Sequence, residues 1–398
     1  MFRNFLSLSF STGSRILINA VLLIVLARYL GAEQYGILVT CLATSSIAVI
    51  ILDFGFSTYL VKSIAENKSL VQDEMRGSLI VKFYLSIIYL MLSQILGLYF
   101  VGLEYNHYFS VLMLVTFLNS FIDFFCIPFR AISKFQEEAK IQVFASLLHI
   151  VIIISAFYYE SLYSVIYSYL IVKFIILCYC FIKFKREFEF SILPSINDLH
   201  YKNAIKILYK LKYYGLDSAI INIRANVDVI IVKSILGYEM AGIYQAASNI
   251  VKSIERVGPI FANLYLPKLS KRDGFYKKNF KQLVILMIAM SFFSAVVLNS
   301  VDFGLVLGTS FDNVDRILVI LTFYLIFRYL SMALGTHITA VGLQSKRVKI
   351  GLFNLLLSIA SNYYFTLYYG VYGAAAAMAI TALMLFVCYF FVYIKSRG

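Results

Sequence analysis

The pattern Leu-Gly-x-Glu-x-x-Gly-Ile occurs twice in this chain, at residues 30–37 and again at residues 236–243. The two copies are offset by 206 residues (236 minus 30), which is about half of the 398-residue chain. At the same offset Leu60 matches Leu266, and Lys62 matches Lys268. Both copies lie in a short polar break between the first two long apolar runs of their half. A fixed internal period of this length predicts two homologous halves.

Apolar runs of about 20 residues recur along the chain and decide its fold class. Of all residues 61% are hydrophobic and 14% are charged, whereas a soluble domain carries roughly 25% charged residues. Each run is long enough to cross about 30 Å of hydrocarbon, and continuous apolar runs predict helices rather than the strands of a β-barrel. We therefore expect an all-α integral membrane protein. Twelve transmembrane helices are predicted, centred near Leu22, Ser46, Leu90, Leu118, Ile150, Ile171, Ala225, Val251, Ser291, Tyr329, Ser358 and Met384.

Lysine and arginine are distributed unevenly between the predicted turns, and this predicts the orientation of the chain. The even-numbered turns and both termini hold 26 of the 35 basic residues, including Lys82, whereas the opposite turns hold only Arg28, Lys233 and Arg316. By the positive-inside rule both termini are predicted to be cytoplasmic. The net charge of +14 then reflects topology and attraction to anionic lipid. Nucleic-acid binding is not expected, because no soluble module carries a basic face interleaved with aromatic residues.

The start of the chain does not have the pattern of a cleaved signal peptide. Arg15 and Asn19 interrupt its apolar region, and no small-x-small cleavage pattern follows. The first apolar run is therefore predicted to be a retained span.

The longest polar break predicts the domain organisation. Residues 1–183 are expected to form an N-terminal six-helix lobe, residues 184–212 a cytoplasmic linker, and residues 213–398 a C-terminal six-helix lobe. In the stretch 199–211, Ile205, Leu208 and Leu211 share one helical face, which is typical of an amphipathic helix on the membrane surface; a solvated basic linker is an equal alternative. Since six spans is an even number, both lobes enter the membrane from the same side. Their pseudo-two-fold axis is thus predicted to lie along the membrane normal.

Two prolines, Pro128 and Pro259, interrupt apolar runs away from the chain ends. Proline leaves a helix carbonyl without its donor, which is tolerable only beside protein or a water-filled cavity. The eighth span is therefore expected to kink near Gly258 and to face the interior there.

Ionisable residues inside the predicted spans are the candidate functional residues. Each would cost at least about 2.5–3.5 kcal/mol if it faced lipid at mid-bilayer, so an inward orientation is the default expectation. The acidic members are Asp53, Asp123, Asp228 and Glu255. The predicted substrate-binding set is Arg15, Asn19, Lys173, Arg224, Asp228, Lys252, Arg256 and Arg328.

Alternatives remain open within this set. Arg224 and Asp228 lie four residues apart and could form a self-satisfied ion pair, while Asp53 and Asp123 could serve as packing hydrogen-bond acceptors. Arg15 and Arg256 could line a cavity or extend to the cytoplasmic surface. The six basic groups against four acidic ones favour an anionic substrate, since a guanidinium binds phosphate bidentately.

Sequence patterns of enzymes and metal sites do not emerge. There is no Gly-x-Ser-x-Gly and no Gly-x-x-x-x-Gly-Lys, and the four histidines are scattered. Cys178 and Cys180 project about 200° apart on a helix, which does not suit a shared metal. No catalytic activity, cofactor or metal is therefore expected.

Two tracts resemble a known family. Residues 28–37, Arg-Tyr-Leu-Gly-Ala-Glu-Gln-Tyr-Gly-Ile, followed by Asp53-Phe-Gly-Phe-Ser, look like the first half of the Wzx-type flippases. Residues 226–232 with residues 236–244 resemble the seventh and eighth spans of the same family, within the superfamily of multidrug and oligosaccharidyl-lipid exporters. The resemblance implies two six-helix lobes, a central cavity and alternating access. It also implies that cationic residues engage a lipid diphosphate, a role that Arg15 and Arg256 match by span and depth.

The resemblance implies a function and partners. The expected function is translocation of undecaprenyl-diphosphate-linked repeat units of O-antigen or capsule from the cytoplasmic to the outer leaflet of a bacterial inner membrane. Expected partners are this lipid-linked oligosaccharide, membrane lipids, a polysaccharide polymerase with its chain-length regulator, and a coupling ion (H⁺ or Na⁺). The alternatives are a multidrug or organic-cation antiporter of the same superfamily, and a membrane polymerase or transferase acting on lipid-linked sugars.

Overall fold

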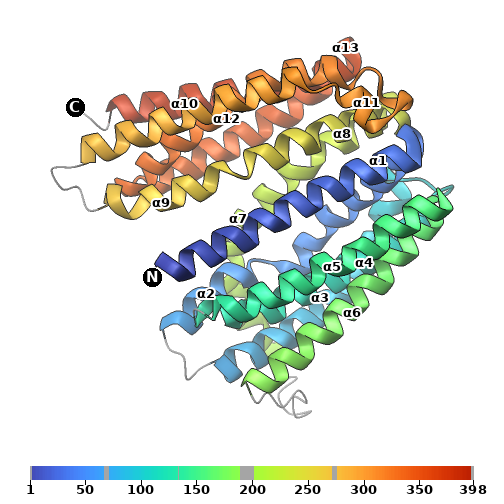
Figure 1. Cartoon of the computed structure of the whole chain (residues 1–398). Helices are drawn as coiled ribbons and strands as arrows, with labels where there is room; N and C mark the ends of the chain where they lie inside the picture. Colours follow the sequence, from blue (N-terminus) through green and yellow to red (C-terminus); the bar gives the residue numbers. More distant parts are fainter. Residues whose placement is uncertain (1, 67–70, 133, 189–200, 271–275, 396–398) are drawn as a thin grey trace. The chain divides into compact units, whose positions relative to one another are not determined.

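A computed structural model describes residues 2–66, 71–132, 134–188, 201–270 and 276–395 (Figure 1). These residues are almost entirely helical, and no strand occurs among them. The helices are α1 (Phe2–Asp53), α2 (Phe56–Glu66), α3 (Val71–Phe100), α4 (Asn106–Ala131), α5 (Phe135–Tyr159), α6 (Leu162–Phe188), α7 (Tyr201–Leu236), α8 (Tyr238–Glu255), α9 (Gly258–Ser270), α10 (Tyr276–Ser300), α11 (Phe303–Leu307), α12 (Val314–Ala340) and α13 (Gln344–Lys395), with a 3₁₀ turn at Thr309–Phe311.

The predicted spans correspond to these helices, two of which contain two spans each. In the described part of the chain, eight helices are long and apolar enough to cross a membrane. α1 changes direction at Gly31 and α13 at Gly370, where the backbone leaves helical geometry. All twelve predicted span centres fall within helices. The all-α membrane fold is thus confirmed, and the count of twelve spans is consistent with it.

The helices gather into two compact units that do not follow the order of the chain. One unit comprises residues 1–15 and 37–226, and the other comprises residues 16–36 and 227–398. In the first unit α4 packs on α2, α3, α5 and α6. In the second unit α12 is central, and packs on α8, α9, α10, α11 and α13. The lobe boundaries at residues 183 and 213, which rest on the longest polar break in the sequence, stay a prediction.

The first part of α7 explains why residues 201–226 join the first unit. Gly55 has a left-handed φ of 79°, and a methyl group added there would lie 2.5 Å from the backbone nitrogen of Gly215. The ring of Tyr59 also lies against that of Tyr214, with 6.1 Å between centroids. The stretch predicted as a surface helix or linker is therefore helical from Tyr201 and continuous with the seventh span. Residues 189–200 lie outside the described part of the chain.

The two copies of the sequence repeat contact each other within the second unit. A Cβ atom added to Gly36 would lie 1.8 Å from the carbonyl oxygen of Tyr238, and one added to Gly242 would lie 2.0 Å from that of Ala32. Positions 36 and 32 become 242 and 238 at the repeat offset of 206, so the contacts are reciprocal. Such close backbone approach requires small residues. The second glycine of each copy is thus explained by the packing of the copies on one another.

The first glycine of each copy has a different role. Gly31 (φ 72°) and Gly237 (φ 88°) both adopt left-handed conformations, which residues with a Cβ rarely adopt. Each glycine redirects the chain from one span into the next. Each copy of the repeat therefore specifies the same kind of turn between two spans.

The predicted kink near Gly258 is confirmed. α8 ends at Glu255, α9 begins at Gly258, and Pro259 follows in its first turn. Gly258 is buried, and a methyl group there would lie 2.5 Å from the Met332 sulfur and 2.9 Å from the Tyr329 ring. The break therefore faces the protein interior, against α12.

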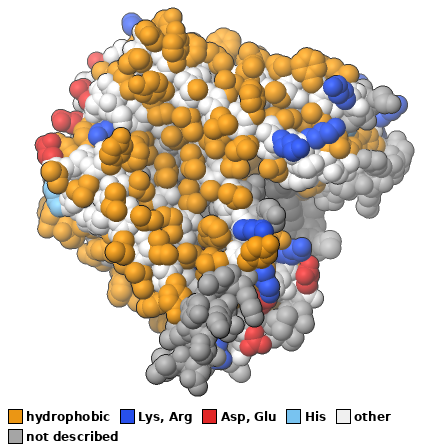
Figure 2. All heavy atoms as spheres, turned by 180° about the vertical axis from the view of Figure 1, so that it is seen from behind, with side chains coloured by type: hydrophobic (Ala, Val, Ile, Leu, Met, Phe, Trp, Pro, Cys, Tyr) orange, Lys and Arg blue, Asp and Glu red, His pale blue; other side chains and the backbone are white. Residues whose placement is uncertain are grey.

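The surface is apolar over large areas. Figure 2 shows hydrophobic side chains spread across one face, with few charged side chains among them. Many large apolar side chains are exposed, as on α3, where Phe83, Met91 and Ile95 are about 60% exposed. Soluble monomeric proteins rarely expose apolar patches of this size to water. This surface is suited to contact with lipid.

Candidate functional site

The predicted substrate-binding residues fall into both units. Lys173 and Arg224 belong to the first unit, and Asp228, Lys252, Arg256 and Arg328 belong to the second. The side chains of Arg15 and Asn19 lie outside the described part of the structure, although both residues are helical. Arg224 and Asp228 belong to different units, so the ion pair considered for them stays a prediction.

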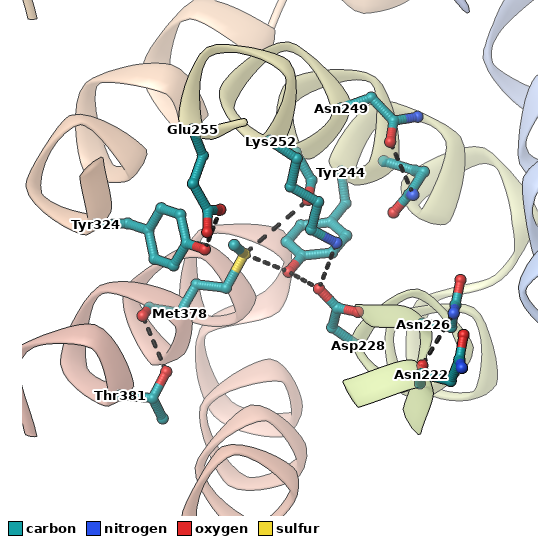
Figure 3. Close-up of polar contacts among 12 residues, drawn as sticks. Asn222, Asn226, Asp228, Tyr244, Asn249, Lys252, Glu255, Tyr324, Met378 and Thr381 are labelled. Carbon is teal, nitrogen blue, oxygen red and sulfur yellow. Dashed lines mark hydrogen bonds and ion pairs between the residues drawn. The ribbon is translucent and has the colours of Figure 1, made fainter. Parts of the chain in front are cut away.

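A cluster of polar side chains around the buried Asp228 lies in the second unit. Asp228 of α7 accepts a hydrogen bond from the Tyr244 hydroxyl (3.0 Å) and pairs with the Lys252 ammonium (3.3 Å), both through Oδ2. The Tyr244 hydroxyl also lies 3.1 Å from the Met378 sulfur of α13. Figure 3 shows these four side chains pointing toward one another from three helices. Asp228 Oδ1 is buried and has no hydrogen-bond partner within the described part of the chain.

A second carboxylate is held nearby at the end of α8. Glu255 accepts a hydrogen bond from the Tyr324 hydroxyl and one from Arg328 Nε, each 2.6 Å long and each to a different oxygen (Figure 3 shows the first). Arg328 and Tyr324 lie four residues apart on α12 and therefore share one face. In the structure Arg328 pairs with Glu255, whereas the sequence gives no sign that these two charges are partners. Charge-assisted hydrogen bonds of this kind are about twice as strong as neutral ones.

Arg256 follows directly, at the break between α8 and α9. Its side chain is exposed, and its backbone amide donates to the carbonyl oxygen of Lys252. Arg256 therefore lies in the turn between the two helices rather than within either of them. A side chain at such a position can reach a ligand that enters from solvent.

The first unit contains a buried cation, Lys82, which the sequence places in a turn. Lys82 was assigned to a cytoplasmic turn, but it lies in the twelfth position of α3 and is 1% exposed. Its ammonium group lies 3.0 Å from Asp53 Oδ1 and 2.5 Å from Ser120 Oγ, with the rings of Phe56, Phe121 and Phe124 within 6 Å. The prediction failed because Lys82 stands near the start of its apolar run. The apolar residues on both sides of it were the available signal.

Lys173 belongs to a separate polar chain in the same unit. Its ammonium donates to Asn119 Oδ1 (2.8 Å), and Asn119 Nδ2 donates to Asp123 (3.2 Å). The partners come from α6 and α4. Lys173 and Asp123 are therefore linked through the Asn119 amide.

The described charges inside the spans are thus largely paired. Asp53, Asp228 and Glu255 each bind a lysine or arginine. Among the described residues, no group of three or more histidine, cysteine, aspartate or glutamate side chains could hold a metal ion. Each of these three carboxylates is thus neutralised by a cation of the same unit, whereas the Arg256 side chain lies exposed at the helix break. Such a protein can bind an anion more readily than a cation.

Comparisons with known proteins identify relatives. Residues 1–273 match the family described as polysaccharide biosynthesis protein. The chain is 27% identical over 211 residues to the capsular polysaccharide biosynthesis protein CapF of Staphylococcus aureus. That match covers 49% of this chain and 52% of CapF, so the chain spans about half the length of this curated relative.

Solved structures share the fold at low sequence identity. The lipid II flippase MurJ in an inward closed conformation is 18% identical, with a TM-score of 0.74 over 97% of this chain and 87% of that chain. An inward-facing multidrug resistance MATE transporter of the MOP superfamily is 15% identical, with a TM-score of 0.71 over 96% and 94%. A MOP superfamily transporter from Pyrococcus furiosus is 14% identical, with a TM-score of 0.54 over 98% and 95%. The two-lobe transporter fold expected from the sequence is confirmed.

The family match covers more than half of the chain, and the fold is that of transporters and flippases rather than of enzymes. This multi-pass membrane protein therefore belongs to the polysaccharide biosynthesis protein family, with the fold of the MOP superfamily.

Proposed function

We propose that this protein is a flippase that moves undecaprenyl-diphosphate-linked oligosaccharide repeat units, of O-antigen or capsule, from the cytoplasmic to the outer leaflet. Alternating access between residues 1–183 and residues 213–398, joined by the linker 184–212, would expose the substrate to one side at a time. Membership of the polysaccharide biosynthesis family is the observation that carries this proposal. The match to a capsular polysaccharide biosynthesis protein supports it.

The charges inside the spans support an anionic head group. Moving a diphosphate across a bilayer requires a path that replaces its water with polar groups, while the isoprenoid tail remains in lipid. The proposed substrate site comprises Arg15, Asn19, Lys173, Arg224, Asp228, Lys252, Arg256 and Arg328, with Arg15 and Arg256 binding the diphosphate. The Asp228 and Glu255 carboxylates would position Lys252 and Arg328 rather than touch the anion.

The runner-up is a multidrug or organic-cation antiporter, because the fold is shared with such a transporter. An exported organic cation needs a carboxylate that is available to it. Three of the four carboxylates inside the predicted spans already bind a lysine or arginine. This pairing favours the flippase.

The proposed location is a bacterial inner membrane, with both termini in the cytoplasm. A polymerase, its chain-length regulator and a coupling ion (H⁺ or Na⁺) are the proposed partners beyond the substrate and the membrane lipids.

Fluorescent reporters that fluoresce only in the cytoplasm should light up when fused after Arg186, Lys277 or Gly398. They should stay dark after Asn106 or Asp312, because those turns carry few basic residues. A bright fusion at Asn106 would contradict the orientation.

Arg256→Ala is expected to lower surface glycan at least about ten-fold, since a lost charge-assisted hydrogen bond is worth roughly 1.5–3 kcal/mol. Arg15→Ala should behave alike, and Arg256→Lys should retain part of the activity because the charge survives while the bidentate fork does not. The measurement is surface glycan in a strain that lacks its own flippase, together with accumulation of lipid-linked repeat units on the cytoplasmic leaflet.

The matched control is Lys277→Ala, which removes one exposed cation from a turn that holds several others. It should leave surface glycan unchanged. Normal glycan in the double Arg15→Ala, Arg256→Ala variant at normal abundance would refute the proposed diphosphate site. If lipid-linked repeat units do not accumulate in the strain that lacks its flippase, the proposed flippase function is refuted.

A further inference from the structure

A small pocket with charged and hydroxyl groups in its lining lies within the second unit, between α9, α12 and the two ends of α13. Its cavity volume is about 180 Å³. Two arginines line it, Arg328 from α12 and Arg347 from the first turns of α13. Sites for drug-sized ligands occupy about 300–1,000 Å³. This pocket therefore suits a small charged group rather than a whole oligosaccharide.

The pocket carries an uncompensated positive charge. Arg328 is neutralised by Glu255 through its Nε, 2.6 Å from Oε1. Arg347 donates from Nη1 to the Thr339 hydroxyl (2.7 Å), and within the described part of the chain it makes no ion pair. One carboxylate, that of Glu255, thus neutralises only one of the two guanidinium groups. The electrostatic potential in the pocket favours an anion.

Hydroxyl groups complete the lining. Ser331, Thr336 and Thr339 lie along one stripe of α12 that faces the pocket. Each hydroxyl donates to the backbone carbonyl four residues earlier, and such a carbonyl already accepts a main-chain hydrogen bond in a helix. Turning a hydroxyl toward a ligand oxygen therefore leaves no helix carbonyl without a donor. The stripe can supply neutral donors beside the two arginines.

The absence of a side chain at Gly335 keeps the pocket open above this stripe. A Cβ atom there would lie 3.2 Å from the Tyr389 ring and 4.0 Å from Arg347 Nε. The Arg347 guanidinium consequently lies over the glycine, on the same side as Thr339. This geometry presents a planar fork of donors to a bound anion.

We propose that this pocket is a phosphate-binding site, in which Arg347 and Arg328 bind phosphate oxygens and the α12 hydroxyls complete their coordination. It shares Arg328 with the substrate site proposed above, but it is built around Arg347, which that site does not include. It rests on pocket geometry alone and does not require the proposed transport function. The phosphate could come from the diphosphate of a lipid-linked sugar, from an anionic lipid head group, or from a free soluble phosphate.

The test measures binding of inorganic pyrophosphate to the full-length protein in an uncharged detergent, by calorimetry and by the shift in thermal unfolding temperature. Wild-type protein should bind, and Arg347→Ala should weaken binding at least about ten-fold. Arg347→Lys should bind with intermediate affinity. Thr339→Val, which keeps the shape and removes one hydroxyl, should cause a smaller loss. Arg347 is exposed, so its replacement should leave the fold intact.

The matched control is Lys346→Ala. Lys346 is the exposed neighbour of Arg347 and has the same charge, but it does not line the pocket. Its removal should leave pyrophosphate binding unchanged. Equal loss of binding in the Lys346 and Arg347 variants, or no binding by the wild type, would overturn the proposal.

Reconstitution identifies the source of the phosphate. Nanodiscs of phosphatidylglycerol should compete with pyrophosphate if the natural ligand is a lipid head group, whereas nanodiscs of phosphatidylcholine should not. Competition by a polyprenyl diphosphate alone would assign the pocket to the substrate. Competition by neither lipid, with binding retained, would assign it to a soluble phosphate. Surface glycan can fail to respond to Arg347→Ala without affecting these results, so the proposed function and this site are tested separately.

Discussion

Gly242→Ala is expected to destabilise the folded protein strongly, although it adds only one methyl group. The new carbon would lie 2.0 Å from the carbonyl oxygen of Ala32 and 3.0 Å from the Gly36 nitrogen. Both neighbours are backbone atoms, so no side chain can rotate away and the helices must separate. Overpacking in a tight core costs about 1–3 kcal/mol and occasionally more. Gly36→Ala should behave the same way, because its methyl would lie 1.8 Å from the Tyr238 oxygen.

Gly351→Ala provides the matched control. Gly351 is also helical, and a methyl group there would meet nothing within 4 Å. Alanine is favoured over glycine in a helix by about 0.8–1.0 kcal/mol, so this variant should be as stable as the wild type or more stable. Thermal unfolding of the purified protein in detergent measures all three. Equal unfolding temperatures for the Gly242 and Gly351 variants would contradict the close packing of the two repeat copies.

Lys82→Met should produce the second large effect. Breaking a buried ion pair by removing one partner costs about 3–5 kcal/mol, because the other charge is left without compensation. Asp53 is 35% exposed, so water stabilises it partly and the lower end of that range is expected. Adding Asp53→Asn to Lys82→Met should recover much of the loss, since both charges are then removed.

The exposed pair between Lys140 and Glu137 is the comparison for this cycle. Lys140 is 59% exposed, and a pair that is exposed to solvent contributes little to stability. Lys140→Met should therefore change the unfolding temperature little. If Lys82→Met is as mild as Lys140→Met, the ion pair with Asp53 does not stabilise the first unit.

The sequence predicts the spans well because the length of an apolar run is itself the physical requirement for crossing a bilayer. The kink before Gly258 was also predictable, since proline cannot continue the hydrogen-bonding of the preceding turn. Lys82 shows where this argument fails. A lysine at the end of an apolar run is expected to lie in the adjacent turn. In the structure Lys82 is instead buried inside a helix, where it pairs with Asp53.

The pairing of charges could not be predicted, because the partners come from helices that are distant in sequence. Glu255 and Arg328 are 73 residues apart, and no local spacing rule connects them. The repeat was visible in the sequence, but its period does not reveal that the two copies touch. That contact depends on how the helices pack after the chain has folded.

The exchange of segments between the two units has a consequence for biosynthesis. Residues 16–36 belong to the unit that also contains residues 227–398, so they are separated from their first later partner by 191 positions (227 minus 36). During translation this segment is synthesised long before Tyr238, which it contacts at Gly36. No single cut of the polypeptide yields two fragments that each contain a whole unit. The segment 16–36 therefore cannot form its native contacts until residues 227–398 have been inserted. Until then, the insertion machinery is a candidate to cover the turn at Gly31.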